Sequence, residues 1–185
     1  LDLGLPAAAA GAYNSMGNVI DAQGRAEETI GLYDRAIATY PSTMWYRNRA
    51  SALINLRRYD EAERDLAAAE TLQAGHPYIL LRRAEIALWR KEPARAASLL
   101  EAAIGQWAFI NDFHLYLALA RLALGLIEAA IEAFAAGLVL THRPREFEAT
   151  AEELDRFESE YGSLPGLERL RALLWDARPQ SSRDG

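Results

Sequence analysis

The sequence predicts an all-α protein built from a repeated helical hairpin. Alanine and leucine, which favour helices, dominate the 185-residue chain, while glycine and proline fall mostly in short connectors. Hydrophobic residues make up 51% and charged residues 25%, the balance of a folded domain. Small residues also recur at a fixed interval. These observations together favour a stack of helices over a mixed or β fold.

The clearest hairpin spans residues 45–70. It reads as two amphipathic helices joined by a short turn at 56–59. Small residues at Ala50, Ala62 and Ala69 mark the places where two helices can approach closely, and bulky residues beside them fill the remaining space.

Small residues recur along the chain at intervals of 34. The three series are Ala50, Ala84 and Ala118; Ala62, Ala96 and Ala130; and Ala69, Ala103 and Gly137. The matching N-terminal residues Gly17, Thr29 and Ala36 precede their partners by 33, which places a one-residue deletion in the loop near Pro41. A repeat of this length predicts hairpins that bury their apolar faces by stacking on one another.

Helix boundaries follow from glycine and proline. The first helix is expected from about Ala10 until Gly24 breaks it, and the second helix ends at Pro41. Pro77 and Pro93 begin the two helices of the third hairpin. The expected organisation is a lead-in at 1–9, hairpins at 10–42, 43–76, 77–110 and 111–144, capping helices or a degenerate fifth hairpin at 145–176, and a disordered tail at 177–185.

The two C-terminal helices are expected to cap the stack. A highly charged helix over 145–161 and a short helix over 167–175 depart from the repeat pattern. Arrays of hairpins need their last apolar face covered. The side chains expected to face inward are Leu154, Phe157, Leu167, Leu170 and Leu174.

The hairpins resemble the tetratricopeptide repeat family. The resemblance is carried by the turn and second helix in residues 24–41 and again in residues 59–69, and it covers about residues 10–142 as four repeats. It implies a right-handed superhelical solenoid of about four helix-turn-helix repeats with C-terminal capping helices. Some residues depart from the family pattern, namely Thr29 at an alanine position, Leu80 and His114 at an aromatic position, and Arg57 and Lys91 at the turn glycine.

Composition and motifs give no candidate for catalysis. The chain has no cysteine, and His76, His114 and His142 lie far apart without carboxylates at ligand spacing. We expect His76 and His142 in loops and His114 as a satisfied core residue. No phosphate-binding loop or nucleophile motif is present. We therefore predict a protein that is not an enzyme and that uses neither a metal nor a cofactor.

Charge and hydropathy exclude further classes. A formal net charge of −6 argues against nucleic-acid partners, including the related helical repeats that bind RNA. The chain lacks an apolar run of 18 residues, so we expect no membrane partner and a cytoplasmic location. It starts at Leu1 without the charged segment of a signal peptide, and we expect an excised domain or a trimmed chain.

The resemblance also implies where a partner would bind. In this family the first helices of the repeats line a concave groove. The matching positions here are Asn14, Asn18, Asp21, Arg47, Asn48, Ser51, Asn55, Tyr78, Arg82, Glu85, Trp89 and Tyr116. Asparagine can donate to and accept from a peptide backbone, arginine can bind carboxylates, and the aromatic residues offer contact area. Some of these residues taken singly fit a solvated polar face equally well.

Co-chaperones of this family clamp an acidic C-terminal peptide with lysine, asparagine and arginine. Asn18, Asn48 and Arg82 match three of the clamp positions, while Asn14 and Tyr78 replace its two lysines. The clamp is therefore incomplete, although Arg47 lies near enough in the pattern to restore one charge.

The leading prediction is an interaction module that binds a peptide or partner segment in the groove, including one with an acidic or C-terminal carboxylate end. A self-assembling scaffold is the first alternative, because the helix over 111–124 has leucines around much of its circumference; it or the C-terminal helices would form the homo-oligomer contact. The second alternative is a regulatory or sensor domain of a larger signalling protein.

Overall fold

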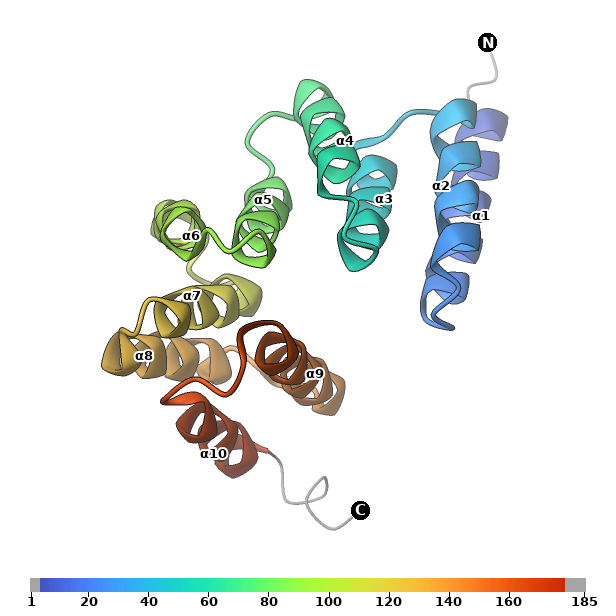
Figure 1. Ribbon diagram of the computed structural model, residues 1–185. Coiled ribbons are helices and arrows are strands. Elements are labelled where there is room, and N and C mark those ends of the chain that lie inside the picture. Colours follow the sequence, from blue (N-terminus) through green and yellow to red (C-terminus); the bar gives the residue numbers. More distant parts are fainter. Residues whose placement is uncertain (1–3, 179–185) are drawn as a thin grey trace. The chain divides into compact units, whose positions relative to one another are not determined.

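The computed structural model describes residues 4–178, and every regular element in that range is a helix. Figure 1 shows them as successive hairpins. In chain order the helices are α1 (Gly4–Asp21), α2 (Ala26–Thr39), α3 (Thr43–Asn55), α4 (Tyr59–Leu72), α5 (Pro77–Trp89), α6 (Pro93–Trp107), α7 (Asn111–Ala123), α8 (Ile127–Val139), α9 (Pro144–Tyr161) and α10 (Leu167–Ala177). The all-α prediction is confirmed.

The helices form two compact units, which divide within α5 after Arg83. In the first unit α1 packs on α2 and α3 packs on α4, while α2 also contacts α3. α1 begins at Gly4, so residues 4–9, expected as a lead-in, are helical. The alanines at 7–10 have the strongest helix preference of any residue, and Pro6 is compatible with a first turn. Residues 1–3 of the lead-in lie outside the described range.

In the second unit α7 is the central helix. It packs against α6, α8 and α9, and α10 packs against both α8 and α9. All five C-terminal side chains expected to face inward are buried, which confirms their assignment. Residues 179–185 of the predicted disordered tail lie outside the described range, and α10 extends to Ala177.

The small residues of the repeat lie where helices touch. The alanines of the three series are fully buried. A side-chain carbon added at Gly17 would lie 2.5 Å from the Tyr33 ring, and one at Gly137 would lie 3.0 Å from the Cβ of His114. The residues that recur with the repeat period therefore lie at helix–helix contacts, as predicted. His114 itself is only half-buried, because it sits at the edge of this contact and bonds the Ala108 carbonyl rather than lying in the core.

Two turns use a residue other than glycine in the left-handed region. Arg57 has a φ of 60° and Lys91 a φ of 65°, close to the 72° and 76° of Gly24 and Gly125 at the matching positions. The turn therefore keeps its left-handed backbone conformation even in the two repeats where another residue replaces the glycine. A side chain in this region costs on the order of 1 kcal/mol.

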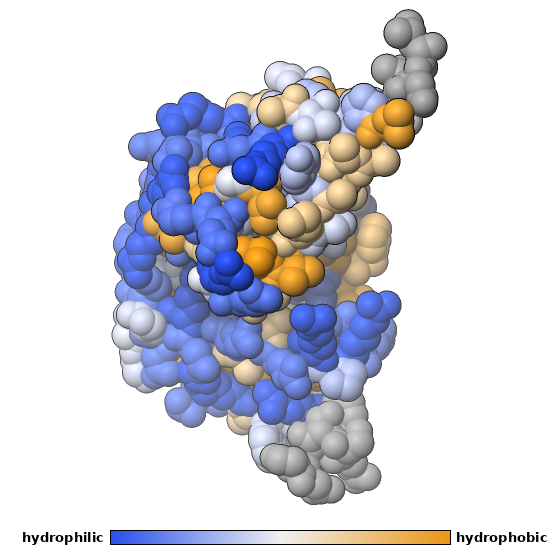
Figure 2. Space-filling model, turned by 90° about the vertical axis from the view of Figure 1, so that its right-hand side faces the viewer, coloured by the Kyte–Doolittle hydropathy of each residue, from blue (hydrophilic) through white to orange (hydrophobic). Residues whose placement is uncertain are grey.

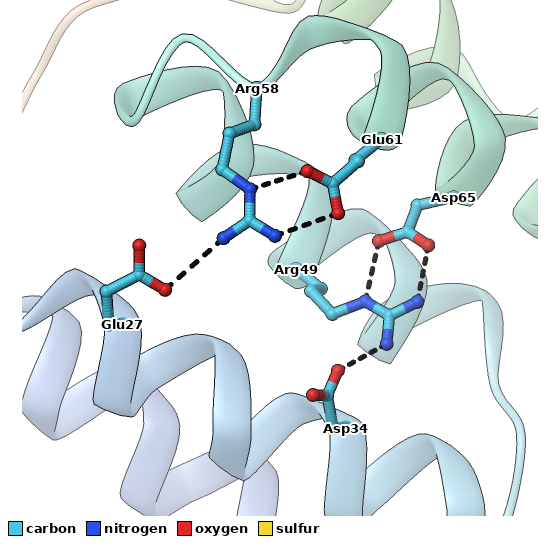
Figure 3. A network of polar contacts seen from close by, with 6 residues as sticks. All are labelled: Glu27, Asp34, Arg49, Arg58, Glu61 and Asp65. Atoms are coloured by element: carbon cyan, nitrogen blue, oxygen red, sulfur yellow. Dashed lines mark hydrogen bonds and ion pairs between the residues drawn. The ribbon is translucent and has the colours of Figure 1, made fainter.

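A network of charged side chains joins the two hairpins of the first unit (Figure 3). Arg49 of α3 donates to both carboxylate oxygens of Asp65 on α4, at 2.5 and 2.7 Å, and to Asp34 on α2 at 2.5 Å. Arg58 bridges Glu61 on α4 and Glu27 on α2. The pairing raises the pKa of Arg49, chiefly through the bond to Asp65. Arg49 thereby fixes α2 and α4 on either side of α3.

Candidate functional site

Nine of the twelve predicted partner-binding residues lie in the first unit. They are carried by α1, α3 and the beginning of α5, the first helices of three successive hairpins. Those nine are Asn14, Asn18, Asp21, Arg47, Asn48, Ser51, Asn55, Tyr78 and Arg82.

Three asparagines from α1 and α3 form an amide cluster. The Nδ2 of Asn48 donates to the Oδ1 of Asn14 at 2.8 Å and to the Oδ1 of Asn18 at 3.4 Å. The hydroxyl of Tyr33 donates to the same Asn18 oxygen at 2.8 Å, and burial raises the pKa of that hydroxyl to about 12. The Oδ1 of Asn48 and the amide nitrogens of Asn14 and Asn18 make no hydrogen bond to another residue in 4–178. Asn14 is buried at 5% exposed and holds the cluster in place, so the groups left for a ligand are the amide nitrogen of the exposed Asn18 and the Oδ1 of the half-buried Asn48.

Arg47 lies beside the cluster on α3. Its guanidinium carbon is 4.9 Å from the centre of the Tyr78 ring, and its Nη1 is 3.1 Å from the Nε2 of His76. Its Nε is buried without a hydrogen-bond partner among the described residues. Burial lowers the pKa of Arg47, and the nearby positive charge of Arg82 lowers it further. A negatively charged ligand group would relieve both effects.

Asp21, Ser51 and Asn55 are the other predicted residues on α1 and α3 of this unit. Asp21 is half-buried, and burial raises the pKa of its carboxyl. Ser51 is half-buried and Asn55 exposed on α3.

The other three predicted residues, in the second unit, are buried. Glu85 is 2% exposed, Trp89 5% and Tyr116 5%. The cause for the first two is α9: its Arg156 lies 4.4 Å above the Trp89 ring and 3.6 Å from the Oε1 of Glu85, which also accepts from the indole nitrogen of Trp89 at 3.4 Å. Tyr116 lies on α7, which α9 also contacts. No partner can reach these side chains while α9 stays in place.

The C-terminal end of α9 is bonded to the end of α5, the helix that carries Glu85 and Trp89. The hydroxyl of Tyr161 donates to the carbonyl of Leu88 at 2.6 Å, and the Nζ of Lys91 lies 3.6 Å from the centre of the Tyr161 ring and donates to the Glu160 carbonyl. Burial raises the pKa of Tyr161 to about 12. The first-helix surface that stays open in residues 4–83 is therefore occupied by the chain itself in residues 84–178.

No group of metal-binding side chains is found within residues 4–178. None of the helices in that range is both long and apolar enough to span a membrane.

Comparison with known proteins identifies the architecture. No family model matches the chain. A solved structure of TTC0263, a TPR protein of Thermus thermophilus, superposes on 91% of this chain and 98% of its own with a TM-score of 0.68 and 21% identity. YrrB, a TPR protein described as having an unusual peptide-binding site, superposes on 91% of this chain and 86% of its own with a TM-score of 0.52 and 14% identity.

The chain has the tetratricopeptide-repeat fold. In sequence, the chain is similar over part of its length to mouse sperm-associated antigen 1, with 38% identity over 68 residues, which are 37% of this chain. The match spans only 8% of that relative's own length. The predicted resemblance is confirmed at the level of fold.

The packing of α9 over Glu85 and Trp89 is the feature of this tetratricopeptide-repeat chain that the sequence did not predict. Arg156 and Tyr161 were absent from the predicted site because they stand at no repeat position. The available signal was the excess of leucine on the helix over 111–124. Four of the five leucines are buried because three neighbouring helices pack on α7, and Leu124 alone is exposed, so α7 offers little apolar surface for the self-contact expected from the sequence.

Proposed function

We propose that this protein is a non-enzymatic interaction module whose first-helix surface in residues 4–83 binds an extended segment of a partner protein. The observation that carries the proposal is the amide cluster of Asn14, Asn18 and Asn48 with Arg47 beside it. Peptide backbones present alternating donors and acceptors, which amide side chains match. The peptide-binding site described for YrrB gives a precedent within the fold.

Arg47 sets the preferred chemistry of the segment. Its buried, unpartnered Nε and its lowered pKa favour a carboxylate, supplied by an acidic side chain or by a chain terminus. The ring of Tyr78 under the guanidinium holds the group in position. Glu85, Trp89 and Tyr116 are left out of this proposal, because they are buried. A cytoplasmic location stays a prediction.

A peptide array tests this proposal. The probes are short extended peptides with acidic residues, each made with a free C-terminal carboxylate and as an amidated twin. We expect binding by fluorescence anisotropy, with Asn48→Ala weakening it about tenfold through the loss of roughly 1.4 kcal/mol of hydrogen bonding. Arg47→Ala should weaken the acidic probes more than neutral ones.

Arg64→Ala is the matched control, since Arg64 is an exposed arginine on α4, a second helix. It removes the same charge and should leave binding unchanged. Circular dichroism checks that the variants keep their helicity. If Asn48→Ala then binds the peptides as tightly as the wild type, the proposal is wrong.

A further inference from the structure

An uncovered apolar stripe runs along α1. Three large apolar side chains on it are open to solvent: Leu5 is 71% exposed, Met16 54% and Val19 59%. Ala8 and Ala12, also exposed, lie between them. At about 100° per residue, these five side chains fall within an arc of about 80°. Figure 2 views the molecule from the side of α1 and shows hydrophobic surface next to the grey N-terminal residues.

The matching positions of the later repeats are helix-packing positions. The residues that match Val19 in the later repeats are Ala52, Ile86 and Ala120, and all three are buried. Within each unit, α3 packs against α2 and α7 against α6, the second helix of the preceding hairpin. The stripe on α1 is thus a helix-packing surface that has no helix against it among the described residues.

The stripe is complementary to itself. Its residues 5, 8, 12, 16 and 19 are spaced 3, 4, 4 and 3 apart, a pattern that reads the same in both directions. In an antiparallel pair of α1 helices centred on Ala12, Ala8 of one copy meets Met16 of the other, and Leu5 meets Val19. The bulky Met16 then fills the space beside the small Ala8, as helix packing requires. A parallel pair would instead set Met16 against Met16.

The charge distribution of α1 permits two copies to associate through the stripe. Asp21 is the only charged residue between Gly4 and Asp21, and it lies off the stripe. Two copies can therefore approach without like-charge repulsion despite the net charge of −6 on each chain. Asn18 lies roughly 120° around the helix from the centre of the stripe, so pairing leaves the amide cluster open.

We infer that two copies of this chain associate through an antiparallel pairing of their α1 helices. The stripe is a single helix face about 21 Å long, so the contact falls in the small size class of weak, transient interfaces and the dimer is reversible. The contact is separate from the proposed peptide-binding surface.

Sedimentation velocity over a concentration series tests the association. We expect the weight-average mass to rise from that of a monomer towards that of a dimer. Met16→Glu with Val19→Glu should keep the protein monomeric throughout. Val139→Glu is the matched control, because Val139 on α8 is a still more open valine, 74% exposed, and its variant should dimerise like the wild type.

Single cysteines test the orientation, since the chain has none of its own. Under mild oxidation Ala12→Cys should form a disulfide-linked dimer, and Val19→Cys should not. A mixture of Leu5→Cys and Val19→Cys should give the mixed dimer. A monomer at every concentration, or loss of the dimer with Val139→Glu alone, would overturn the inference, as would cross-linking of Val19→Cys as fast as Ala12→Cys.

Discussion

The first helices of the two units carry matching repeat positions and meet different surroundings. In residues 4–83 these positions hold Asn18 and Asn48, which keep amide groups without a partner among the described residues, and Arg47, whose buried Nε also lacks one. In residues 84–178 they hold Glu85 and Trp89, which lie under α9. The same hairpin design thus supports a binding surface in one unit and a packed core in the other. What differs is side-chain polarity: a buried tryptophan gains from a cover, and a row of amides does not.

The largest expected effect comes from breaking the covered surface. Trp89→Ala should lower the free energy of unfolding by about 3–4 kcal/mol, because it leaves a cavity beneath Arg156. Asn55→Ala changes the matching residue of the preceding repeat, which is exposed, and should cost far less. Urea unfolding followed by circular dichroism measures both. Equal losses would contradict the contrast between the two surfaces.

The next effect concerns the ion pairs that stabilise the first unit, residues 4–83. Arg49→Ala should cost about 3 kcal/mol, since it leaves the buried carboxylate of Asp65 without its partner. Arg58→Ala is the matched change within the same network. Its partners Glu27 and Glu61 are exposed, so its loss should be much smaller. The comparison uses thermal and urea unfolding, and it fails if Arg58→Ala is the more damaging variant.

The smallest expected effect is a pH dependence in the open unit. Burial, and then the Arg47 charge, lower the pKa of His76 from 6.5, so the unfolded chain takes up this proton at a higher pH than the folded protein. The stabilisation is therefore fully present above pH 6.5 and declines as the pH falls from 6.5 towards the lowered pKa.

Melting temperatures across this range measure the decline, which His76→Gln should reduce. His142→Gln, at an exposed histidine, should leave the decline as it is in the wild type. If the melting temperature of His76→Gln falls with pH as much as that of the wild type, His76 is not the cause of the pH dependence.

The candidate site was only partly predictable. The period located the first helices, and helical spacing placed Asn14, Asn18 and Asn48 at neighbouring positions. Their hydrogen bonds required coordinates, because Asn48 is 30 and 34 residues from its partners. The cover over Glu85 and Trp89 lay beyond prediction, since a repeat pattern describes contacts between neighbouring hairpins, and Arg156 is 71 residues from Glu85.

The sequence by itself determined the fold, the length of each hairpin and the places where helices touch. These depend on local periodicity and on small residues such as Gly17, where an added side-chain carbon would lie 2.5 Å from the Tyr33 ring. Only the tertiary structure decided which first-helix residues are open and which are covered. That choice depends on where α9 packs, and a distant contact of this kind leaves no period in the sequence.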